Sequence, residues 1–583
     1  MYDMNVLQTV LLPNASFGCS NEMYINGCNF YPINNVLKIK TGGNVSFDTY
    51  YNGLSTVLWK EKCGIKNVAF NMCGAGEALV KLIVVNENNV RFELDSIKTE
   101  LTNNSVQLFN LNLEKVIQRG LVYIEVIACD SDVEIYSASW TTQEETKRKV
   151  KLGISITHFN RKNYVLPSID RVKKELLDDP EYADKIDFAV VDNSKNIQAD
   201  EAEGVTIIPN ENTGGAGGFM RGLMHYEDKG DFTHVLFMDD DASCEIESIK
   251  RAYAILTYAI EDNAAISGAL FLESNPDILI EKGAFFDNTC HPLFSGFDLS
   301  RTINVVKSEV SLQVPNYGGW WFFAFPINYV KHKAFPFFVR GDDILFGMMN
   351  KFNIITCNGI ACYSEDFATK VSAMTWYLDT RNHLVNTILY KNSFIPSALM
   401  YSRFFMACLF SHQYGSLKSI RLALHHVLGN KEFWSQNYDL KEVRTTIAEL
   451  SVDEKMKPID LTSLDIKQRT NEERPIRRVI RILSLNGMLL PLKDQLVYQE
   501  KRAFASFRAI FGFKNILYYN SSSQTGYIAQ VSRGEFFKNL VLLLKDIVSI
   551  AVSFKSNKKK YKSLASELTT NDFWEKILKS KSE

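Results

Sequence analysis

The stretch FTHVLFMDDD, residues 232–241, decides how the centre of this chain folds. An apolar run of strand length ends in three consecutive aspartates, which is typical of a buried strand that carries polar groups at its carboxyl end. Like charges repel, so three acids at such a place indicate that a positive ligand is expected there. If the strand geometry continues, Asp239 and Asp241 project to the same side.

Strand and helix patterns alternate in the residues that precede this stretch. KLGISITHF (151–159), IDFAVVDNS (186–194) and GVTIIPNEN (204–212) have the pattern of strands. Two stretches have helical spacing: LPSIDRVKKELLDD (166–179) lies between the first two strands, and TGGAGGFMRGLMHYEDKG (213–230) lies between the third strand and residues 232–241. This order predicts a mostly parallel sheet with covered faces, whose ligands bind at the carboxyl ends of the strands.

The regions on either side have different sequence patterns. Residues 1–147 contain short alternating runs punctuated by Gly and Asn, which favours a β-sandwich of the carbohydrate-module type. After a charged hinge comes the alternating region, and from about residue 390 the sequence looks helical. We predict a multidomain α/β protein: a β-sandwich at 1–147, a Rossmann-like domain at 148–390 and a helical domain at 391–583.

Composition indicates a globular protein of several domains. The chain has 583 residues, 46% of them hydrophobic, with a net charge of −2. This balance gives no sign of nucleic-acid binding. The ten cysteines form no CxxC pair, so we expect reduced thiols in a cytoplasmic protein and no zinc site. The N-terminus has no basic region before its apolar run, so no signal peptide is expected, and no apolar run is long enough to predict a spanning helix.

One segment near the C-terminus has two interpretations. EFFKNLVLLLKDIVSIAVSF (535–554) is strongly apolar, and the lysine cluster SNKKKYKS (556–563) follows it. Such a helix could lie on an anionic membrane surface. It could equally be a packing helix with a solvated tail. Both alternatives stay open at this stage.

The aspartates at the strand end suit a divalent cation. Asp239 and Asp241 offer the oxygen ligands that Mg²⁺ and Mn²⁺ prefer, and such ions commonly bridge carboxylates to phosphates. The alternative is structural, because an Asp here could be the N-cap of a following helix.

Three further motifs fit the same chemistry. The glycines of NTGGAGGF (212–219) would let backbone amides approach a diphosphate, although the stretch could be a plain turn. GDDILF (341–346) offers a second acid pair, one of which could take a proton from an attacking hydroxyl, unless the pair only caps a helix. PNYGGWWFFAFP (315–326) presents two tryptophans that suit sugar rings or a core strand. We expect one of them to be exposed and the other packed.

Together these motifs resemble family 2 glycosyltransferases of the GT-A type, in particular the bacterial galactofuranosyltransferases, the group that contains the mycobacterial galactan polymerase. SFDTYYNGLSTVLWKEK resembles that group's β-sandwich, and THFNRK, VVDNS, NENTGGAGGFMRG, FMDDD, GGWWFFAFP and RGDDILF follow in the family's order. The resemblance implies an inverting, metal-dependent transfer of galactofuranose from UDP-galactofuranose to a hydroxyl of a lipid-linked surface glycan.

The resemblance also implies roles for individual residues. Asp343 would be the catalytic base, and Asp239 and Asp241 would bind Mn²⁺ or Mg²⁺. The acceptor site would contain Trp320, Trp321 and Asp342. The donor site would contain Thr157, Phe159, Asn160, Arg161, Asp192, Asn212, Gly214, Gly215, Gly217, Gly218, Arg221 and Asp240.

One position departs from the family pattern. The family places a His metal ligand before a Tyr-x-x-x-Arg-Asn helix, and here Ser364 stands in that place, ahead of WYLDTRN. Glu365 or Asp366 could substitute as an oxygen ligand. His383 is a weaker candidate, because it lies on the helix itself.

Two rival functions remain open. The donor could be another nucleotide sugar, such as dTDP-rhamnose or UDP-galactopyranose, since fold does not fix substrate. The protein could also be a non-catalytic carbohydrate-binding protein. The expected partners are a UDP-sugar, a glycan or glycolipid acceptor and a membrane surface, with no nucleic acid. An oligomer is compatible with the sequence. The expected location is cytoplasmic, peripheral on the inner face of the cytoplasmic membrane.

Overall fold

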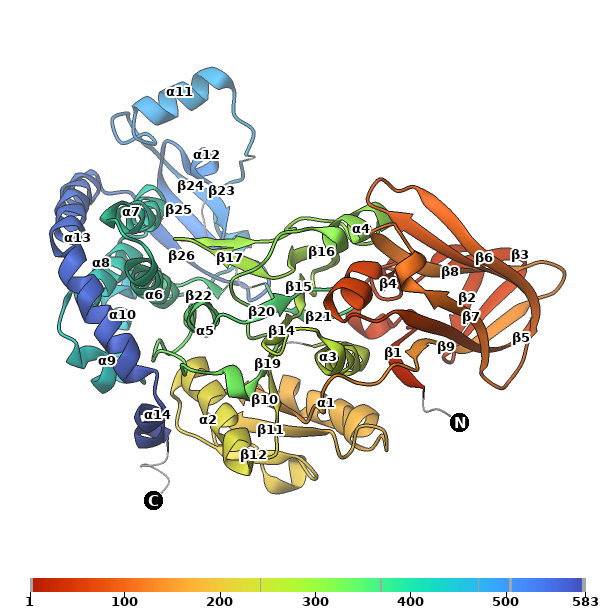
Figure 1. Ribbon diagram of the computed structural model, residues 1–583. Coiled ribbons are helices and arrows are strands. Elements are labelled where there is room, and N and C mark those ends of the chain that lie inside the picture. The colour runs from red at the N-terminus through yellow and green to blue at the C-terminus, as the bar shows by residue number, and fades with distance from the viewer. Residues whose placement is uncertain (1–3, 242, 367–369, 470, 503–505, 579–583) are drawn as a thin grey trace.

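The three regions predicted from the sequence follow one another across the molecule, from an N-terminal sheet through a central α/β region to a helical C-terminal region (Figure 1). The computed structural model describes residues 4–241, 243–366, 370–469, 471–502 and 506–578. The predicted fold class is confirmed. The domain limits at 147/148 and 390/391 stay a prediction.

The N-terminal region is one antiparallel sheet that folds back on itself. Its long strand β5 pairs with β7 and β9 through residues 67–75 and with β6 and β8 through residues 76–86. A sheet whose strands change partners along their length bends into two layers, as in the predicted sandwich. Its strands are β1 (Asn5–Thr9), β2 (Asn26–Ile33), β3 (Val36–Ser46), β4 (Leu54–Ser55), β5 (Asn67–Asn86), β6 (Arg91–Leu101), β7 (Val106–Asn112), β8 (Gly120–Ala128) and β9 (Val133–Thr142).

The central sheet has the strand order β12-β11-β10-β13-β19-β14-β20. The first four strands run parallel, and only β19 is antiparallel to its neighbours, so the sheet is mostly parallel as predicted. Thr157 pairs with Asp239 and His158 with Asp192, which places these strand ends at one edge. The strands are β10 (Leu152–His158), β11 (Ile186–Asp192), β12 (Thr206–Pro209), β13 (His234–Asp239), β14 (Ala264–Ser267), β19 (Phe323–Pro326) and β20 (Asn353–Ile355).

Smaller elements complete this region. A three-stranded sheet consists of β15 (Ala269–Leu272), β16 (Asn275–Glu281) and β21 (Ala361–Ser364), and β17 (Ala284–Phe286) pairs with β18 (Cys290–Pro292). The helices are α1 (Lys162–Val172), α2 (Gly214–Lys229), α3 (Ile246–Tyr258), α4 (Thr302–Val310) and α5 (Asp342–Asn350).

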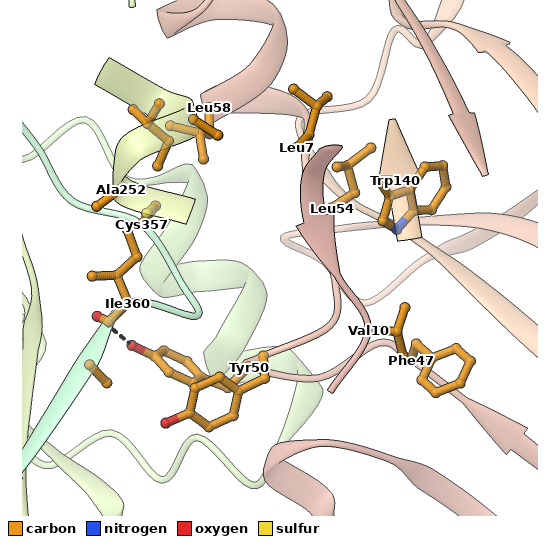
Figure 2. Packing of buried hydrophobic residues seen from close by; sticks show 14 of the residues in the cluster. Leu7, Val10, Phe47, Tyr50, Leu54, Leu58, Trp140, Ala252, Cys357 and Ile360 are labelled. Carbon is orange, nitrogen blue, oxygen red and sulfur yellow. Dashed lines mark hydrogen bonds between the residues drawn. The ribbon is translucent and has the colours of Figure 1, made fainter. Parts of the chain in front are cut away.

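The N-terminal sheet and the central region share one hydrophobic core. Figure 2 shows Leu54 and Trp140 of the sheet on one side of this core and Ala252 and Ile360 on the other. The Tyr50 hydroxyl crosses the boundary and donates to the Ile360 carbonyl over 3.2 Å. The sheet is therefore fixed to the central region by apolar packing and hydrogen bonds.

The C-terminal region is helical, with α6 packed against α7 and α8, and α13 against all three. Its helices are α6 (Ala373–Tyr390), α7 (Phe394–Phe410), α8 (Tyr414–Leu428), α9 (Glu432–Gln436), α10 (Lys441–Leu450), α11 (Pro475–Leu483), α12 (Phe507–Ile510), α13 (Arg533–Leu568) and α14 (Asn571–Leu578).

A five-stranded sheet inside this region was not predicted. Its order is β22-β26-β25-β24-β23, with strands β22 (Lys457–Pro458), β23 (Ile466–Lys467), β24 (Lys493–Glu500), β25 (Phe513–Asn520) and β26 (Thr525–Gln530). Its buried side is a small core that includes Val497, Ile516 and Tyr518.

The segment 535–554 is part of α13. One stripe of this helix, which includes Phe536, Leu543 and Ile550, is buried against the other helices, as the packing interpretation predicts. Val548 and Val552 on the opposite side are exposed. None of the described helices combines the length and the apolar character needed to span a bilayer.

The last helix, α14, returns to the central region and packs against α2 (Figure 1). The indole of Trp574 is 1% exposed and donates to the Ala334 carbonyl over 2.8 Å. A Cβ at Gly217 would lie 3.3 Å from this indole. Trp574 therefore supports the first turn of α2 from the outside.

We predict that Trp574→Ala lowers the free energy of unfolding by about 3–5 kcal/mol, because it removes a large buried side chain and a hydrogen bond. Denaturant unfolding followed by fluorescence or circular dichroism measures the change. The control is Val552→Ala, at a position that is 82% exposed, which should shift the value by about 0.5 kcal/mol or less. Equal effects from both substitutions would contradict the buttressing role of Trp574.

Candidate active site

The three aspartates of the 232–241 stretch lie where β13 ends. The strand stops at Asp239, and Asp240 and Asp241 belong to the turn that follows. The strand geometry therefore does not continue to Asp241, so the two side chains are placed by a turn and not by strand alternation. No N-cap hydrogen bond from these aspartates begins α3, whose N-cap residue is Glu245.

Positive groups surround the turn. Arg161, in the loop after β10, forms an ion pair with Asp241 and lies 3.7 Å from Asp240. Lys370 Nζ lies 3.2 Å from Asp241 Oδ2. The His158 ring lies 3.2 Å from Asp240, and although its burial favours the neutral form, hydrogen bonds to Asp240 and Asn196 raise the pKa of His158.

The second acid pair begins helix α5. Asp342 and Asp343 are its first two residues, after Gly341 in the left-handed conformation with φ 78°. Acids at this place are stabilised by the helix N-terminus, and Asp343 Oδ1 accepts from the Ile344 amide over 2.8 Å. The cap interpretation and the active-site interpretation of this pair are thus compatible.

Side chains of α6 hold the loop that leads into this pair. Asn382 Nδ2 donates to the carbonyls of Val339 and Arg340 over 3.0 and 2.6 Å, and Asn386 Nδ2 donates to Gly341 over 3.1 Å. Because these carbonyls are fixed by buried amides, the start of α5 has a defined position.

The two acid groups act on each other electrostatically. The pKa of Asp239 is raised well above its usual range, mainly by burial. Repulsion raises it further, from the carboxylates of Asp241, Asp240, Asp342 and Asp343. Burial also raises the pKa of Asp342 and of Asp343, and for Asp343 the amides at the start of α5 and the charge of Arg340 offset part of it. A carboxylate with a raised pKa is a better base at neutral pH.

The glycines of the 212–219 stretch serve mainly for close packing. A Cβ at Gly218 would lie 2.3 Å from Thr157, and at Gly214 it would lie 2.2 Å from the Phe338 carbonyl. The amides of Gly214, Ala216 and Gly217 donate to Asn212, Phe338 and Thr213, respectively. Gly215 is the roomier position, and a Cβ there would lie 3.8 Å from Asp342 Oδ2.

The other donor-site candidates at the strand ends differ in accessibility. Phe159 is 45% exposed and its amide donates to Asp240. The Thr157 hydroxyl is buried without a hydrogen-bond partner. The Asn160 amide donates to Ser194 over 2.9 Å.

The Asp192 carboxylate accepts hydrogen bonds from residues of the loop that follows it. The donors are Ser194, Asn196 and Ile197, and these bonds outweigh the burial of the carboxylate, so the pKa of Asp192 is lowered. Arg221 lies two turns into α2. Burial lowers the pKa of His225, and the charges of Lys229 and Arg221 lower it further. Neither Asp192 nor Arg221 has a described contact with the acid cluster.

The two tryptophans differ in burial, but neither is exposed, so the expectation of one exposed tryptophan was wrong. Trp320 is 5% exposed and packs among Phe219, Phe237 and Phe346. Trp321 is half-buried, and its indole donates to the Gly268 carbonyl over 3.1 Å. Of the pair, Trp321 is therefore the one with surface to offer a sugar.

The residues fit a divalent cation in part. Asp239 lies among four other carboxylates, an environment that favours added positive charge, but Asp241 is held by Arg161 and Lys370. Hydrogen bonds from Lys370 and Tyr164 lower the pKa of Glu365, which keeps this carboxylate charged. Within the described residues, no three His, Cys, Asp or Glu side chains are grouped as metal ligands.

The candidates around the missing His lie at different places. Ser364 is 1% exposed at the end of β21 and donates to the Glu365 carbonyl. Asp366 follows in the same loop. His383 is on the other side of the site, with Nε2 3.5 Å from Cys290 Sγ.

Two cavities open beside the acid groups. One, of about 180 Å³, is lined by Tyr164, Asp240, Asp241 and Glu273. The other, of about 270 Å³, is lined by Cys290, Trp376, His383 and Phe404, and by the Arg340–Asp379 pair, whose atoms are 2.9 and 3.0 Å apart. The first cavity thus includes two acids of the β13 turn, and the second includes Arg340, which lies two residues before Asp342.

Glu281 is a neighbour that the sequence analysis missed. It ends β16, is buried, and its Oε1 atom has no hydrogen-bond partner. Burial, with a further contribution from Asp343, raises the pKa of Glu281 to about 8. No motif marks this residue, because it follows an apolar strand pattern, DILIE, that any buried strand could have.

Comparison with known families matches the two regions separately. Residues 29–143 match the description Galactofuranosyltransferase 2 N-terminal, and residues 154–277 match Glycosyl transferase family 2. Residues 154–277 are therefore similar to family 2 glycosyltransferases. The matched residues include the aspartates of β13 and the glycine-rich start of α2, while Asp342 and Asp343 lie beyond them.

The matched relatives include two named galactofuranosyltransferases. Galactofuranosyltransferase GlfT2 of Mycolicibacterium smegmatis is 23% identical over 391 residues, and that of Mycobacterium tuberculosis 23% over 388. These alignments cover 62% and 61% of this chain and 60% of each relative. The chain thus matches about three fifths of the length of these relatives, and the glycosyltransferase resemblance is confirmed at the level of the family.

Solved structures give weaker likenesses. GalNAc-T7 with UDP, GalNAc and Mn²⁺ has a TM-score of 0.33 at 9% identity, over 44% of this chain and 52% of that one. Mannosyl-3-phosphoglycerate synthase from Rubrobacter xylanophilus has a TM-score of 0.27 at 12% identity, over 41% and 74%. A family 29 carbohydrate-binding module has a TM-score of 0.16 at 18% identity, over 24% and 92%.

We predict that Glu281→Gln stabilises the protein increasingly as the pH rises from 5 to 8. The folded protein keeps the Glu281 proton up to about pH 8, whereas the unfolded chain loses it near pH 4.5. The wild type therefore loses up to about 1.4 kcal/mol of unfolding free energy per pH unit in this window, and the neutral amide does not.

Denaturant unfolding at several pH values measures this difference. Glu203→Gln is the control, because the side chain of Glu203 is exposed. Parallel pH curves for the wild type and Glu281→Gln would refute the neutral state of Glu281.

Proposed function

We propose that this protein is an inverting, metal-dependent glycosyltransferase that moves galactofuranose from UDP-galactofuranose to a hydroxyl of a surface glycan. The observation that carries the proposal is the meeting of the β13 aspartates with Asp342 and Asp343 at one edge of a parallel sheet. In the proposed arrangement the β13 aspartates face the leaving group and Asp343 faces the acceptor hydroxyl, as a one-step displacement requires.

Asp343 is the proposed base. Its carboxylate takes the proton of the acceptor hydroxyl, whose oxygen attacks the anomeric carbon while the bond from that carbon to the diphosphate oxygen breaks. The configuration inverts, and UDP leaves with the bonding electrons. The raised pKa of Asp343 suits this role near neutral pH, and the hydrogen bonds from α6 keep the base in place.

The donor side is proposed to hold UDP beside Asp240. Phe159, with its exposed ring, is available to stack on the uracil, and Arg161 is the cation closest to the turn. We assign the anion contact of the glycine stretch to Gly215, since neighbouring amides of the same turn already donate to protein acceptors.

A divalent cation, Mn²⁺ or Mg²⁺, is proposed to bind at Asp239 and Asp241, where it would neutralise charge on the departing diphosphate. For Asp241 to take part, Arg161 and Lys370 must release it, and an incoming diphosphate offers both cations a new partner. Glu365 and Asp366 remain the candidates for a further oxygen ligand.

The choice of galactofuranose rests on the relatives. Both are galactofuranosyltransferases by name, and residues 29–143 match an N-terminal region named for such an enzyme. The acceptor is proposed to be a lipid-linked glycan, which would enter from the side of the 270 Å³ cavity with Trp376 and the Arg340–Asp379 pair.

We predict that the purified protein transfers sugar from UDP-galactofuranose to a synthetic galactoside and requires Mn²⁺ or Mg²⁺. The assay offers UDP-galactofuranose, UDP-galactopyranose and dTDP-rhamnose in parallel, with and without a chelator, and detects products by mass spectrometry. Product from another donor alone would overturn the sugar assignment. Glycan binding with no nucleotide release from any donor would instead support the non-catalytic alternative.

We predict that Asp343→Asn lowers kcat by about 10²-fold or more while UDP affinity changes little, because only the proton acceptor is lost. Calorimetric titration with UDP and steady-state kinetics separate the two effects. Asp262→Asn, at an exposed ion pair with Arg148, is the matched control and should keep wild-type kinetics. Full turnover in Asp343→Asn would exclude Asp343 as the base.

A further inference from the structure

Helix α11 (Pro475–Leu483) carries apolar and basic residues on opposite faces. At about 100° per residue, its five Ile, Leu and Val side chains fall on one side and its three arginines on the other. The apolar residues are Ile476, Val479, Ile480, Ile482 and Leu483, and the arginines are Arg477, Arg478 and Arg481.

Two arginines of the basic face, Arg477 and Arg481, are turned toward the protein, whereas Arg478 at its border is exposed. Arg477 donates to the Arg508 carbonyl over 3.4 Å, and its guanidinium lies 5.6 Å from the centre of the Phe511 ring. Arg481 forms a two-bond ion pair with Glu473, with distances of 2.9 and 3.0 Å. These contacts fix the rotation of the helix about its axis.

The apolar face is therefore turned outward. Ile476 is 76% exposed, Leu483 74% and Val479 55%, and Leu489 just beyond the helix is 61% exposed. A surface helix of a globular protein normally has the reverse orientation, with its apolar stripe on the core. Figure 1 shows α11 at the outer end of the C-terminal sheet, away from the other long helices. A contiguous apolar face in this position indicates a surface that something covers.

The charge around this face indicates what covers it. Residues 466–508 contain ten Lys or Arg and four Asp or Glu, although the whole chain has a net charge of −2. Arg474 and Arg478 are exposed beside the apolar residues. An apolar face bordered by arginines matches an anionic lipid surface, where the apolar side chains enter the acyl boundary and the arginines contact headgroups.

We propose that α11 is a membrane-surface anchor that inserts its apolar face into the headgroup region of an anionic bilayer. The orientation of the helix by Arg477 and Arg481 prepares it for this contact without a conformational change. The helix is far too short to cross the bilayer, so the protein lies on the surface. The anchor assigned here is α11, not the segment 535–554, whose buried stripe is used for packing.

Vesicle co-sedimentation tests the proposal without any enzyme assay, so its outcome is independent of the proposed function. The wild-type protein is mixed with vesicles of phosphatidylcholine alone or with added phosphatidylglycerol, at low and high salt. We expect binding to the anionic vesicles that weakens with salt. The triple variant Ile476→Glu, Val479→Glu, Leu483→Glu should lower the partition coefficient by about tenfold or more.

Two further variants make the test specific. Arg474→Gln with Arg478→Gln should reduce binding to anionic vesicles and leave binding to neutral ones unchanged. The matched control is Val541→Glu, Leu544→Glu, Val548→Glu, which adds the same charge to the exposed face of α13 and should keep wild-type partitioning. Circular dichroism checks that each variant is folded.

Three results would overturn the proposal. The first is equal vesicle binding by the wild type and the α11 triple variant. The second is loss of binding in the α13 variant while the α11 variant still binds. The third is a wild type that does not bind anionic vesicles. If the wild type then forms an oligomer that the α11 variant cannot form, this face is a protein interface.

Discussion

The site depends on the repulsion between carboxylates that the fold forces together. Asp239, Asp240 and Asp241 come from the end of β13, and Asp342 and Asp343 from the start of α5, two segments far apart in the sequence. Burial makes their shared charge more costly, since water cannot screen it. A protein keeps such a cluster only if the surrounding structure holds both segments in place.

Two kinds of support offset this repulsion. On the β13 side, cationic side chains from other elements, Arg161 and Lys370, pair with Asp241. On the α5 side there is less cationic charge, and the support is mostly backbone: the helix N-terminus and the carbonyls that Asn382 and Asn386 hold. Burial raises the pKa of Asp343, and this backbone support only partly offsets the rise. On the β13 side, Asp241 is paired with cationic side chains that could exchange it for another anion.

Much of the fold could be predicted, because the spacing of hydrophobic residues along the sequence indicates which segments are strands and which are helices. The run HVLFM is buried on both faces, as is typical of an inner strand of a mostly parallel sheet, and the helices between strands follow from spacing. The sheet β22–β26 was missed for a local reason. FKNILYYN and TGYIAQ alternate and are joined by the turn residues SSSQ, but their surroundings are helical and the other strands are short. The tertiary pairing of such strands leaves little trace in the sequence.

The site was predictable in its acids and less so in their neighbours. Motifs located Asp239 and Asp343, whereas Glu281 and the Arg340–Asp379 pair depend on which loops meet in three dimensions. Glycine-rich sequence was ambiguous, since Gly218 is small to admit Thr157 and not to admit a ligand. In the same way, no pattern distinguishes Trp320 from Trp321, because which ring is packed depends on Phe237 and Phe346.

The contact of Trp574 with α2 has a consequence for biosynthesis. A ribosome makes the chain from its N-terminus, so the β10–β13 strands emerge long before residue 574. Until α14 has been made, the turn around Gly217 lacks the Trp574 indole that packs beside it. The first turn of α2 therefore reaches its final packing only late in the synthesis of the chain.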